Sequence, residues 1–280
     1  AFVQLDLTSD KGWEDATNGC TFVLHVASPF TIANPKTEDE MIIPAVEGTL
    51  RVLRAAKQAG VARVVLTSSA LAMFGSMKTG KFDADDWTDV NAPKVSTYTK
   101  SKTLAERAAW DFITEQSGDN AMELVAINTG GVFGPPLGRN ISGQTMSMVD
   151  QMLRGKLPMV PNAAFPMVDV RDVAMLHVKA MTLPEANGLR VVAASAKPFG
   201  FAQVAQILID EGYKGPSTRI APDLLLHFIS LFDREAKGMV GFLGMKLEAD
   251  NTSTRTLFDW RPIPLDQSVR ETAAAVQATR

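Results

Sequence analysis

The sequence predicts an α/β protein in which a doubly wound parallel sheet is followed by a smaller, mainly helical lobe. Short continuous apolar runs, such as residues 21–26 and 122–127, alternate with longer stretches that have helical periodicity. Such alternation favours a parallel sheet covered by helices on both faces. Hydrophobic residues make up 46% of the 280 residues, which is enough for a sizeable core.

The strands are expected in the order of these apolar runs. Residues 1–8 have the pattern of a strand that begins at the first residue, and residues 21–26 follow as a strand buried on both faces. Further strands are predicted at residues 61–66, at residues 122–127 and, as a short strand, at residues 188–194. The carboxyl ends of the first four strands carry small or polar residues, which a ligand crevice on a parallel sheet requires.

Helices are expected between these strands. Pro44 fits the first turn of a helix with an apolar stripe, and Gly60 ends that helix. A long loop that includes the acidic residues 83–89 is predicted next, followed by a helical run over residues 96–112.

The predicted domain organisation rests on a change in the sequence pattern after Pro136. Residues 1–136 form the predicted sheet domain, and residues 137–280 form a substrate-binding lobe that is glycine-rich, then methionine-rich and later mainly helical. Residues 168–194 are expected to return to the first domain. The sequence contains neither an internal repeat nor a low-complexity linker.

Composition and charge exclude several function classes. The net charge is −3, and the absence of a basic tract argues against nucleic acid as a partner. The apolar runs are too short to span a bilayer, which argues against a membrane protein. Cys20 is the only cysteine, which fits a reducing, cytoplasmic location, and no Cys/His spacing resembles a metal site. A monomer or homodimer that acts on a small molecule is expected.

Tyr98 and Lys102 are the first candidates for chemistry. They are four residues apart, so on a helix they share one face. A free phenol ionises near pH ~10, but a neighbouring ammonium group favours the phenolate and lowers that pKa. Such a pair can exchange a proton with a substrate oxygen. By itself the spacing is common in amphipathic helices, so the neighbouring motifs decide its meaning.

Seven motifs in one order resemble the extended short-chain dehydrogenase/reductases of the NAD-dependent epimerase/dehydratase superfamily, which have a Rossmann-type sheet. Within this family the chain looks most like the dihydroflavonol reductase-like group, which includes aldehyde and ketone reductases. The motifs are Tyr98 with Lys102, Thr67-Ser68-Ser69-Ala70, His25-Val26-Ala27-Ser28-Pro29, Pro44-Ala45-Val46-Glu47-Gly48-Thr49, Asp86-Trp87-Thr88-Asp89, Val132-Phe133-Gly134-Pro135 and Val168-Asp169-Val170-Arg171-Asp172-Val173-Ala174.

The resemblance implies a catalytic triad of Ser69, Tyr98 and Lys102. Ser69 would hydrogen-bond the carbonyl oxygen of the substrate, and Tyr98 would protonate that oxygen during hydride transfer from a nicotinamide. Lys102 would lower the pKa of Tyr98 and hold the nicotinamide ribose. Glu106 and Trp110 receive no function, since a solvated face and a packed aromatic side chain explain them.

The resemblance also implies a set of cofactor contacts along the carboxyl ends of the strands. Asp6 and Leu7 would lie near the adenine, and Val26, Ala27 and Ser28 near the phosphates and ribose. Thr67 is also included in the set, although a plain strand-end turn is the preferred explanation for both Thr67 and Ser68. Thr129 and Val132 would flank the nicotinamide, and Tyr98 and Lys102 complete the set.

Two departures from the family pattern stand out. The family usually has proline where this chain has Thr129, followed here by Gly130-Gly131, which loosens the wall beside the nicotinamide. No Gly-x-x-Gly-x-x-Gly loop occurs, although such a loop normally receives the pyrophosphate at a helix N-terminus. We therefore expect the chain to be truncated by two strand–helix units, or about sixty residues at roughly thirty per unit. The expected cofactor is NADP, and NAD remains open.

Three functions are therefore compared. The first is NADP(H)-dependent reduction of an aldehyde or ketone to an alcohol. The second is sugar-nucleotide epimerisation or dehydration on the same fold, which is disfavoured because Arg139 and Arg154 are the only arginines between Pro136 and Arg171. The third is a non-catalytic dinucleotide-sensing module or an inactive truncated chain. Cinnamoyl-CoA is disfavoured as a substrate, because Val95-Ser96-Thr97-Tyr98-Thr99 replaces the Asn-Trp-Tyr-Cys-Tyr block of the plant cinnamoyl-CoA reductases.

Overall fold

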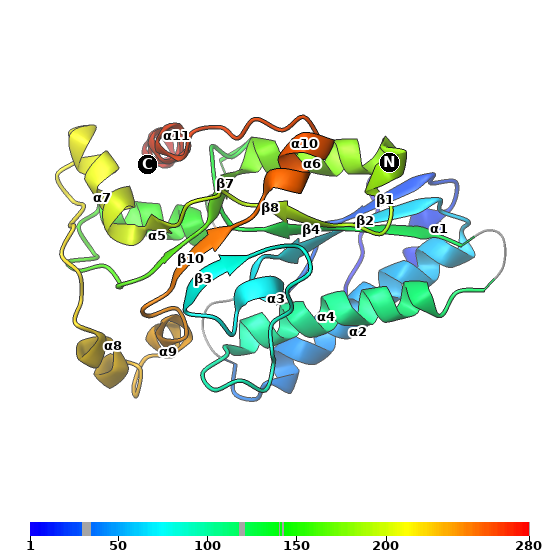
Figure 1. The fold of residues 1–280 in the computed structure, drawn as a ribbon, viewed down its shortest axis with the longest axis horizontal. Coiled ribbons are helices and arrows are strands. Elements are labelled where there is room, and N and C mark those ends of the chain that lie inside the picture. Colours follow the sequence, from blue (N-terminus) through cyan, green and yellow to red (C-terminus); the bar gives the residue numbers. More distant parts are fainter. Residues whose placement is uncertain (30–34, 118–120, 140, 142, 280) are drawn as a thin grey trace.

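The computed structural model describes residues 1–29, 35–117, 121–139, 141 and 143–279. Its central element is a four-stranded sheet in the order β1-β2-β4-β8, and every neighbouring pair is parallel (Figure 1). The four strands are β1 (Phe22–His25), β2 (Arg63–Ser69), β4 (Glu123–Thr129) and β8 (Arg190–Ala193). The α/β fold class with a parallel sheet is confirmed.

The two central strands form the core because their side chains are apolar on both faces. Val64 and Leu124 pack beneath the helices α2 (Asp39–Gln58) and α4 (Thr97–Thr114), whereas Val65 and Val125 pack beneath α6 (Val170–Thr182). All four side chains are fully buried. The sheet is therefore a middle layer, with α2 and α4 on one side and α6 on the other (Figure 1).

A second, mixed sheet lies beside the first and has the order β3-β10-β6-β9. It combines β3 (Thr79–Phe82) with strands from the second half of the chain, namely β10 (Lys246–Ala249), β6 (Ala164–Phe165) and β9 (Phe199–Gly200). A two-stranded parallel sheet of β5 (Gly131–Phe133) and β7 (Met167–Asp169) connects the two halves. Strand β8 pairs with β4, so residues 190–193 extend the central sheet, while the division at Pro136 stays a prediction.

The second half of the chain has its own apolar core, in which Val149, Met152, Val204, Leu208 and Val269 are almost fully buried. They come from α5, α7 and α11, which lie together at one end of the molecule (Figure 1). The remaining helices are α1 (Trp13–Thr17), α3 (Leu71–Phe74), α5 (Gln144–Leu153), the short 3-10 helix η1 (Pro184–Ala186), α7 (Phe201–Asp210), α8 (Asp223–Ile229), α9 (Arg234–Val240), α10 (Thr252–Leu257) and α11 (Leu265–Ala278). Within the described residues, none of the helices has the length and apolarity to cross a membrane.

Three local predictions are wrong. Residues 1–8 are not a strand, because no neighbouring strand among the described residues pairs with their backbone. Pro44 lies inside α2 rather than in its first turn, since that helix begins at Asp39. The predicted long loop contains α3 and β3, because Phe74 and Phe82 are buried against each other with ring centroids 4.7 Å apart.

Candidate active site

Tyr98 and Lys102 lie in the first turns of α4. The helix begins here because Ser96 is a side-chain N-cap: its hydroxyl accepts a hydrogen bond from the Thr99 amide at 3.1 Å. Lys102 is only 8% exposed, and its Nζ lies 6.0 Å from the centroid of the Tyr98 ring. The sequence spacing therefore gives the expected pair on one face of the helix.

Ser69 lies beside this pair at the carboxyl end of β2. The chain turns directly from β2 into α3, and the Ser69 hydroxyl accepts a hydrogen bond from the Leu71 amide at 3.2 Å. The Ser69 side chain also hydrogen-bonds the Tyr98 hydroxyl. The structure thus brings all three members of the predicted triad together at one end of the sheet.

Burial controls the charge states at this site. It raises the pKa of Tyr98, and the hydrogen bond from Ser69 opposes that rise only in part. Burial also lowers the pKa of Lys102 to about 8, against the attraction of Glu106. The net direction of the Tyr98 pKa is opposite to the sequence prediction, because loss of solvent outweighs the hydrogen bond from Ser69. Tyr98 is therefore protonated at neutral pH, as a proton donor must be.

A small pocket opens beside Lys102 at the carboxyl ends of β1 and β2. It is lined by His25, Ala27, Ser28, Thr49, Leu66, Thr67, Ser68, Lys102, Ala105 and Glu106. Four of the predicted cofactor contacts are in this set. Burial, and next to it the Lys102 charge, lower the pKa of His25 to about 4, so its imidazole is neutral at neutral pH. The pocket therefore combines hydroxyl groups with one ammonium group.

Thr129 and Val132 lie on the other side of the triad. Thr129 is directly opposite Ser69 in the β2–β4 register, and its hydroxyl donates to the Ser68 carbonyl at 3.4 Å. Val132 follows in β5 and is half-buried. Between them, Gly130 lies so close to Pro166 that an added Cβ would be 2.4 Å from its carbonyl oxygen. Gly130, which follows the Thr129 that replaces the usual proline, thus allows a close approach of the two backbones. The looser wall beside the nicotinamide stays a prediction.

Three other predicted cofactor contacts, Asp6, Leu7 and Val26, are not in the pocket lining. The Asp6 carboxylate accepts hydrogen bonds from the amide and the hydroxyl of Thr8, and Leu7 packs against Gly48 of α2. Val26 is 61% exposed beyond the end of β1. Thr67 lines the pocket, but its hydroxyl also hydrogen-bonds the imidazole of His177 at 2.7 Å, toward α6.

The sequence interpretation of Glu106 as part of a solvated face is wrong. Glu106 is only 1% exposed, and its carboxylate accepts hydrogen bonds from Ser68, Asn128 and Arg190. The reason is its position one turn after Lys102 on the face of α4 that packs on the sheet. Only the spacing from Lys102 could have indicated this from the sequence, because Asn128 and Arg190 are distant in the chain.

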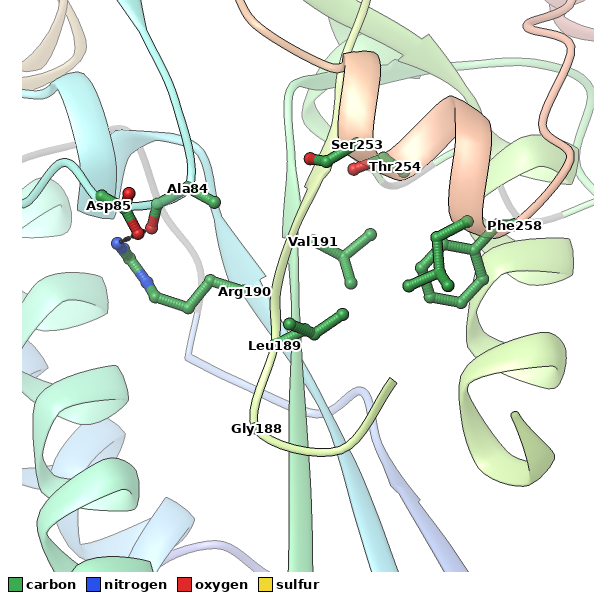
Figure 2. Close-up of a pocket in the computed structure, with 10 residues that line it drawn as sticks. Ala84, Asp85, Gly188, Leu189, Arg190, Val191, Ser253, Thr254 and Phe258 are labelled. Carbon is green, nitrogen blue, oxygen red and sulfur yellow. Dashed lines mark hydrogen bonds between the residues drawn. The ribbon is translucent and has the colours of Figure 1, made fainter. Parts of the chain in front are cut away.

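A second cavity of about 240 Å³ lies at the opposite edge of the sheet, where β8 begins. Figure 2 shows the Arg190 side chain extending from this strand toward Ala84 and Asp85, while Val191 and Phe258 line the other side of the cavity. None of the predicted site residues contributes to its lining. Among the described residues, no group of acidic, histidine and cysteine side chains could hold a metal ion.

Comparison with known protein families shows to which family the chain belongs. Residues 1–193 match the model of the 3-beta hydroxysteroid dehydrogenase/isomerase family. The chain belongs to this family. Its relatives include reductases of the dihydroflavonol reductase-like group, so the predicted kinship with the extended short-chain dehydrogenase/reductases is confirmed.

Two curated relatives illustrate this kinship. Cinnamoyl-CoA reductase 1 of Arabidopsis thaliana is 35% identical over 208 residues, which are 72% of this chain and 57% of the relative. The NADPH-dependent methylglyoxal reductase GRE2 of Saccharomyces cerevisiae is 31% identical over 206 residues, which are 68% of this chain and 60% of the relative. The matched region thus spans less than two thirds of each of these relatives.

The solved structures agree with the fold. The crystal structure of Gre2 from Candida albicans in complex with NADPH superimposes with a TM-score of 0.76 at 26% identity. The match covers 98% of this chain and 82% of the Gre2 chain. The Rossmann-type parallel sheet is therefore shared with an NADPH-bound reductase of the family.

Proposed function

We propose that the protein is an NADP(H)-dependent oxidoreductase that reduces an aldehyde or ketone to an alcohol. The observation that carries the proposal is the hydrogen-bonded pair of Ser69 and Tyr98, with Lys102 one turn further along α4. The reductase names of the relatives, including a methylglyoxal reductase and an NADPH-bound Gre2, support the same class.

The polar groups that line the small pocket beside Lys102 suit the ribose on the nicotinamide side of such a cofactor. Lys102 and the Ser28 hydroxyl offer hydrogen-bond donors to ribose oxygens. The Thr67 hydroxyl donates its proton to Nε2 of His177, because Nδ1 of that imidazole donates to the Val173 carbonyl, so Thr67 can only accept a hydrogen bond from the ribose. When bound, the reduced nicotinamide supplies the hydride, which this chain's own side chains cannot provide.

The protein's part of the reaction is to orient the carbonyl group and deliver a proton. The Ser69 hydroxyl donates a hydrogen bond to the carbonyl oxygen, which draws electron density away from the carbon. Tyr98 then transfers its proton to the same oxygen as the alcohol forms. A buried, protonated phenol suits this role, because the raised pKa keeps the proton in place until negative charge develops on the oxygen.

The sugar-nucleotide alternative fits the second lobe less well. A diphosphate needs basic side chains that are free to bind it. Arg154 instead forms an ion pair with Asp150 in α5, and Arg171 binds both Asp169 and Glu271. The carbonyl reductase is therefore the preferred function.

The experiment is a substrate comparison with the full-length protein. NADPH oxidation is followed by absorbance with methylglyoxal, an aliphatic aldehyde and an aromatic ketone, and UDP-glucose turnover is measured separately. We expect NADPH consumption with at least one carbonyl compound, with the matching alcohol as product. Turnover of UDP-glucose in the absence of any carbonyl reduction would overturn the proposal in favour of the alternative.

A further inference from the structure

Glu106 is the best connected buried carboxylate beside the triad. Its Oε2 accepts hydrogen bonds from the Ser68 hydroxyl and, at 2.6 Å, from Nδ2 of Asn128. Its Oε1 accepts from Nε of Arg190 at 2.7 Å and from Nε1 of Trp110 at 3.4 Å. The Glu106 carboxylate thus accepts hydrogen bonds from four different residues, whereas a charged residue on a helix surface is usually solvated instead.

Three of the four partners of Glu106 come from three different strands of the sheet, and the fourth, Trp110, is on α4 itself. Ser68 directly precedes Ser69 at the end of β2, Asn128 directly precedes Thr129 in β4, and Arg190 begins β8. Glu106 itself is on α4, one turn beyond Lys102. One side chain therefore connects the helix that carries the proton donor to the strand ends that face it.

We propose that Glu106 is a positioning residue for Tyr98 and Lys102. Its carboxylate holds α4 in register against the ends of β2 and β4, and it provides the negative charge that faces the Lys102 ammonium group. This inference rests on the proposed reductase function and deepens it. Glu106 does not touch the reacting atoms; it acts through Lys102 and through the placement of Ser69.

The charges around Lys102 show why this counter-charge is needed. From α4, Lys102 has Glu106 one turn ahead and the Tyr98 phenol one turn behind. The neutral imidazole of His25, from β1, lines the same pocket as Lys102. Arg190, from β8, forms an ion pair with Glu106. Among the described residues that line the pocket, Glu106 is the one carboxylate beside Lys102. It opposes the burial that lowers the pKa of Lys102 to about 8.

The first test is the pH profile of kcat/KM for carbonyl reduction. Without the Glu106 charge, Lys102 loses its proton at lower pH, so the loss of activity on the alkaline side begins earlier. For Glu106→Gln we expect this alkaline limb to move down by about one pH unit, the usual effect of one close opposite charge. Glu106→Asp keeps the charge and should restore the limb toward its original position. An unmoved limb in Glu106→Gln would overturn the inference.

The matched control is Glu123→Gln. Glu123 also pairs with a buried arginine, Arg63, but at the other end of the sheet. This variant should lose thermal stability as Glu106→Gln does, while its pH profile should overlay that of the parent protein. If both variants shift the limb equally, the effect is general destabilisation and the proposed role of Glu106 is wrong.

The second test does not depend on activity. In protein labelled with ¹³Cε-lysine, the Lys102 resonance is identified by its absence in Lys102→Arg, and its pKa is read from a pH titration. We expect a lower pKa in Glu106→Gln than in the parent protein. If the parent protein shows no carbonyl reduction but the pKa still falls, the proposed function fails while the electrostatic role of Glu106 stands. An unchanged pKa overturns that role whatever the activity.

A double variant covers the case in which Glu106→Gln does not fold because it leaves Arg190 unpaired. Glu106→Gln with Arg190→Met removes both charges, which proteins tolerate better than one orphaned charge. Lys102 again has no carboxylate beside it, so the same downward movement of its pKa is expected. A folded double variant with an unchanged Lys102 pKa would refute the inference.

Discussion

The side chains of Ser69 and Tyr98 are hydrogen-bonded to each other where β2 ends and α4 begins. The bond fixes two oxygen atoms at the end of the sheet where a substrate carbonyl can meet both. Because Ser69 belongs to a strand and Tyr98 to a helix, the packing of α4 on the sheet determines their geometry. This relationship leads to the first two predictions.

Tyr98→Phe removes only the hydroxyl group that we propose as the proton donor. We expect kcat for carbonyl reduction to fall by about 10²- to 10⁴-fold, the usual contribution of one general acid. The fold should be retained, and circular dichroism checks this. Ser69→Ala removes the other partner of the hydrogen bond and serves as a comparison, since it should also lower kcat while leaving the phenol in place. Turnover of Tyr98→Phe at the parental rate would exclude Tyr98 from the mechanism.

Lys102→Arg keeps the positive charge at this position but removes a group that can lose its proton near pH 8. Since burial lowers the pKa of Lys102 to about 8, reduction by the parent protein should decline as the pH rises through about 8. An arginine side chain stays protonated far above this range, because the pKa of a guanidinium is much higher. We therefore expect the variant to lose the decline near pH 8, and to bind NADPH more weakly because the guanidinium is larger and planar. A pH series of the reduction rate measures the first effect, and calorimetry of NADPH binding measures the second. If the variant keeps the decline near pH 8, that decline belongs to a group other than Lys102.

The central strands and the placement of Tyr98 and Lys102 on one helix face could be predicted because they depend on short-range patterns, whereas Ser69 was implied only by the family resemblance. The spacing of Tyr98 and Lys102 is local, and apolar runs such as residues 122–127 must be buried wherever they lie. What determines the setting of Lys102 is not local. Glu106 contacts Asn128 and Arg190, which are 22 and 84 residues away in the chain. A charged residue on a helix is usually solvated, so only the packing of α4 reveals that this one is buried.

The same reasoning explains the errors at other positions. Residues 1–8 have strand composition, but a strand also needs a neighbour, and composition does not show which strand pairs with which. The direction of the Tyr98 pKa depends on solvent access, which no spacing gives. The close approach of Gly130 to the backbone of Pro166 could not be foreseen either, because the two residues are 36 positions apart in the sequence numbering.

Asp169 makes the stability of the fold depend on pH in the acidic range. Its carboxylate is fully buried at the N-cap of α6, where it accepts hydrogen bonds from Arg171 and, at 2.6 Å, from Ser268. Burial pushes its pKa upward, but these hydrogen bonds more than offset that effect, so the net pKa is lowered. A lowered folded-state pKa stabilises the protein above the unfolded value of about 4, and this stabilisation is lost as the pH falls through the folded value.

Asp169→Asn is expected to remove this acid sensitivity. The variant should be less stable at neutral pH by about 1–3 kcal/mol, because Arg171 and Ser268 lose a charged acceptor. Its stability should change less than that of the parent protein between pH 5 and pH 3, roughly the range in which a free carboxyl titrates. Urea unfolding across this range measures both effects. Parallel curves for the two proteins would show that Asp169 contributes nothing to the pH dependence.

Gly130→Ala tests whether the close backbone approach supports the site. The new Cβ would be 2.4 Å from the Pro166 carbonyl oxygen, and since backbone atoms cannot rotate away, β4 or the segment before β7 must shift. Overpacking of this kind costs about 1–3 kcal/mol. Because Thr129 precedes Gly130 and lies opposite Ser69, the shift should also lower kcat. Gly138→Ala is the control: a Cβ there has no atom within 4 Å, so its stability should stay within about 0.5 kcal/mol of the parent. Equal melting temperatures for the two variants would show that the backbone around Gly130 can accommodate the added Cβ without loss of stability.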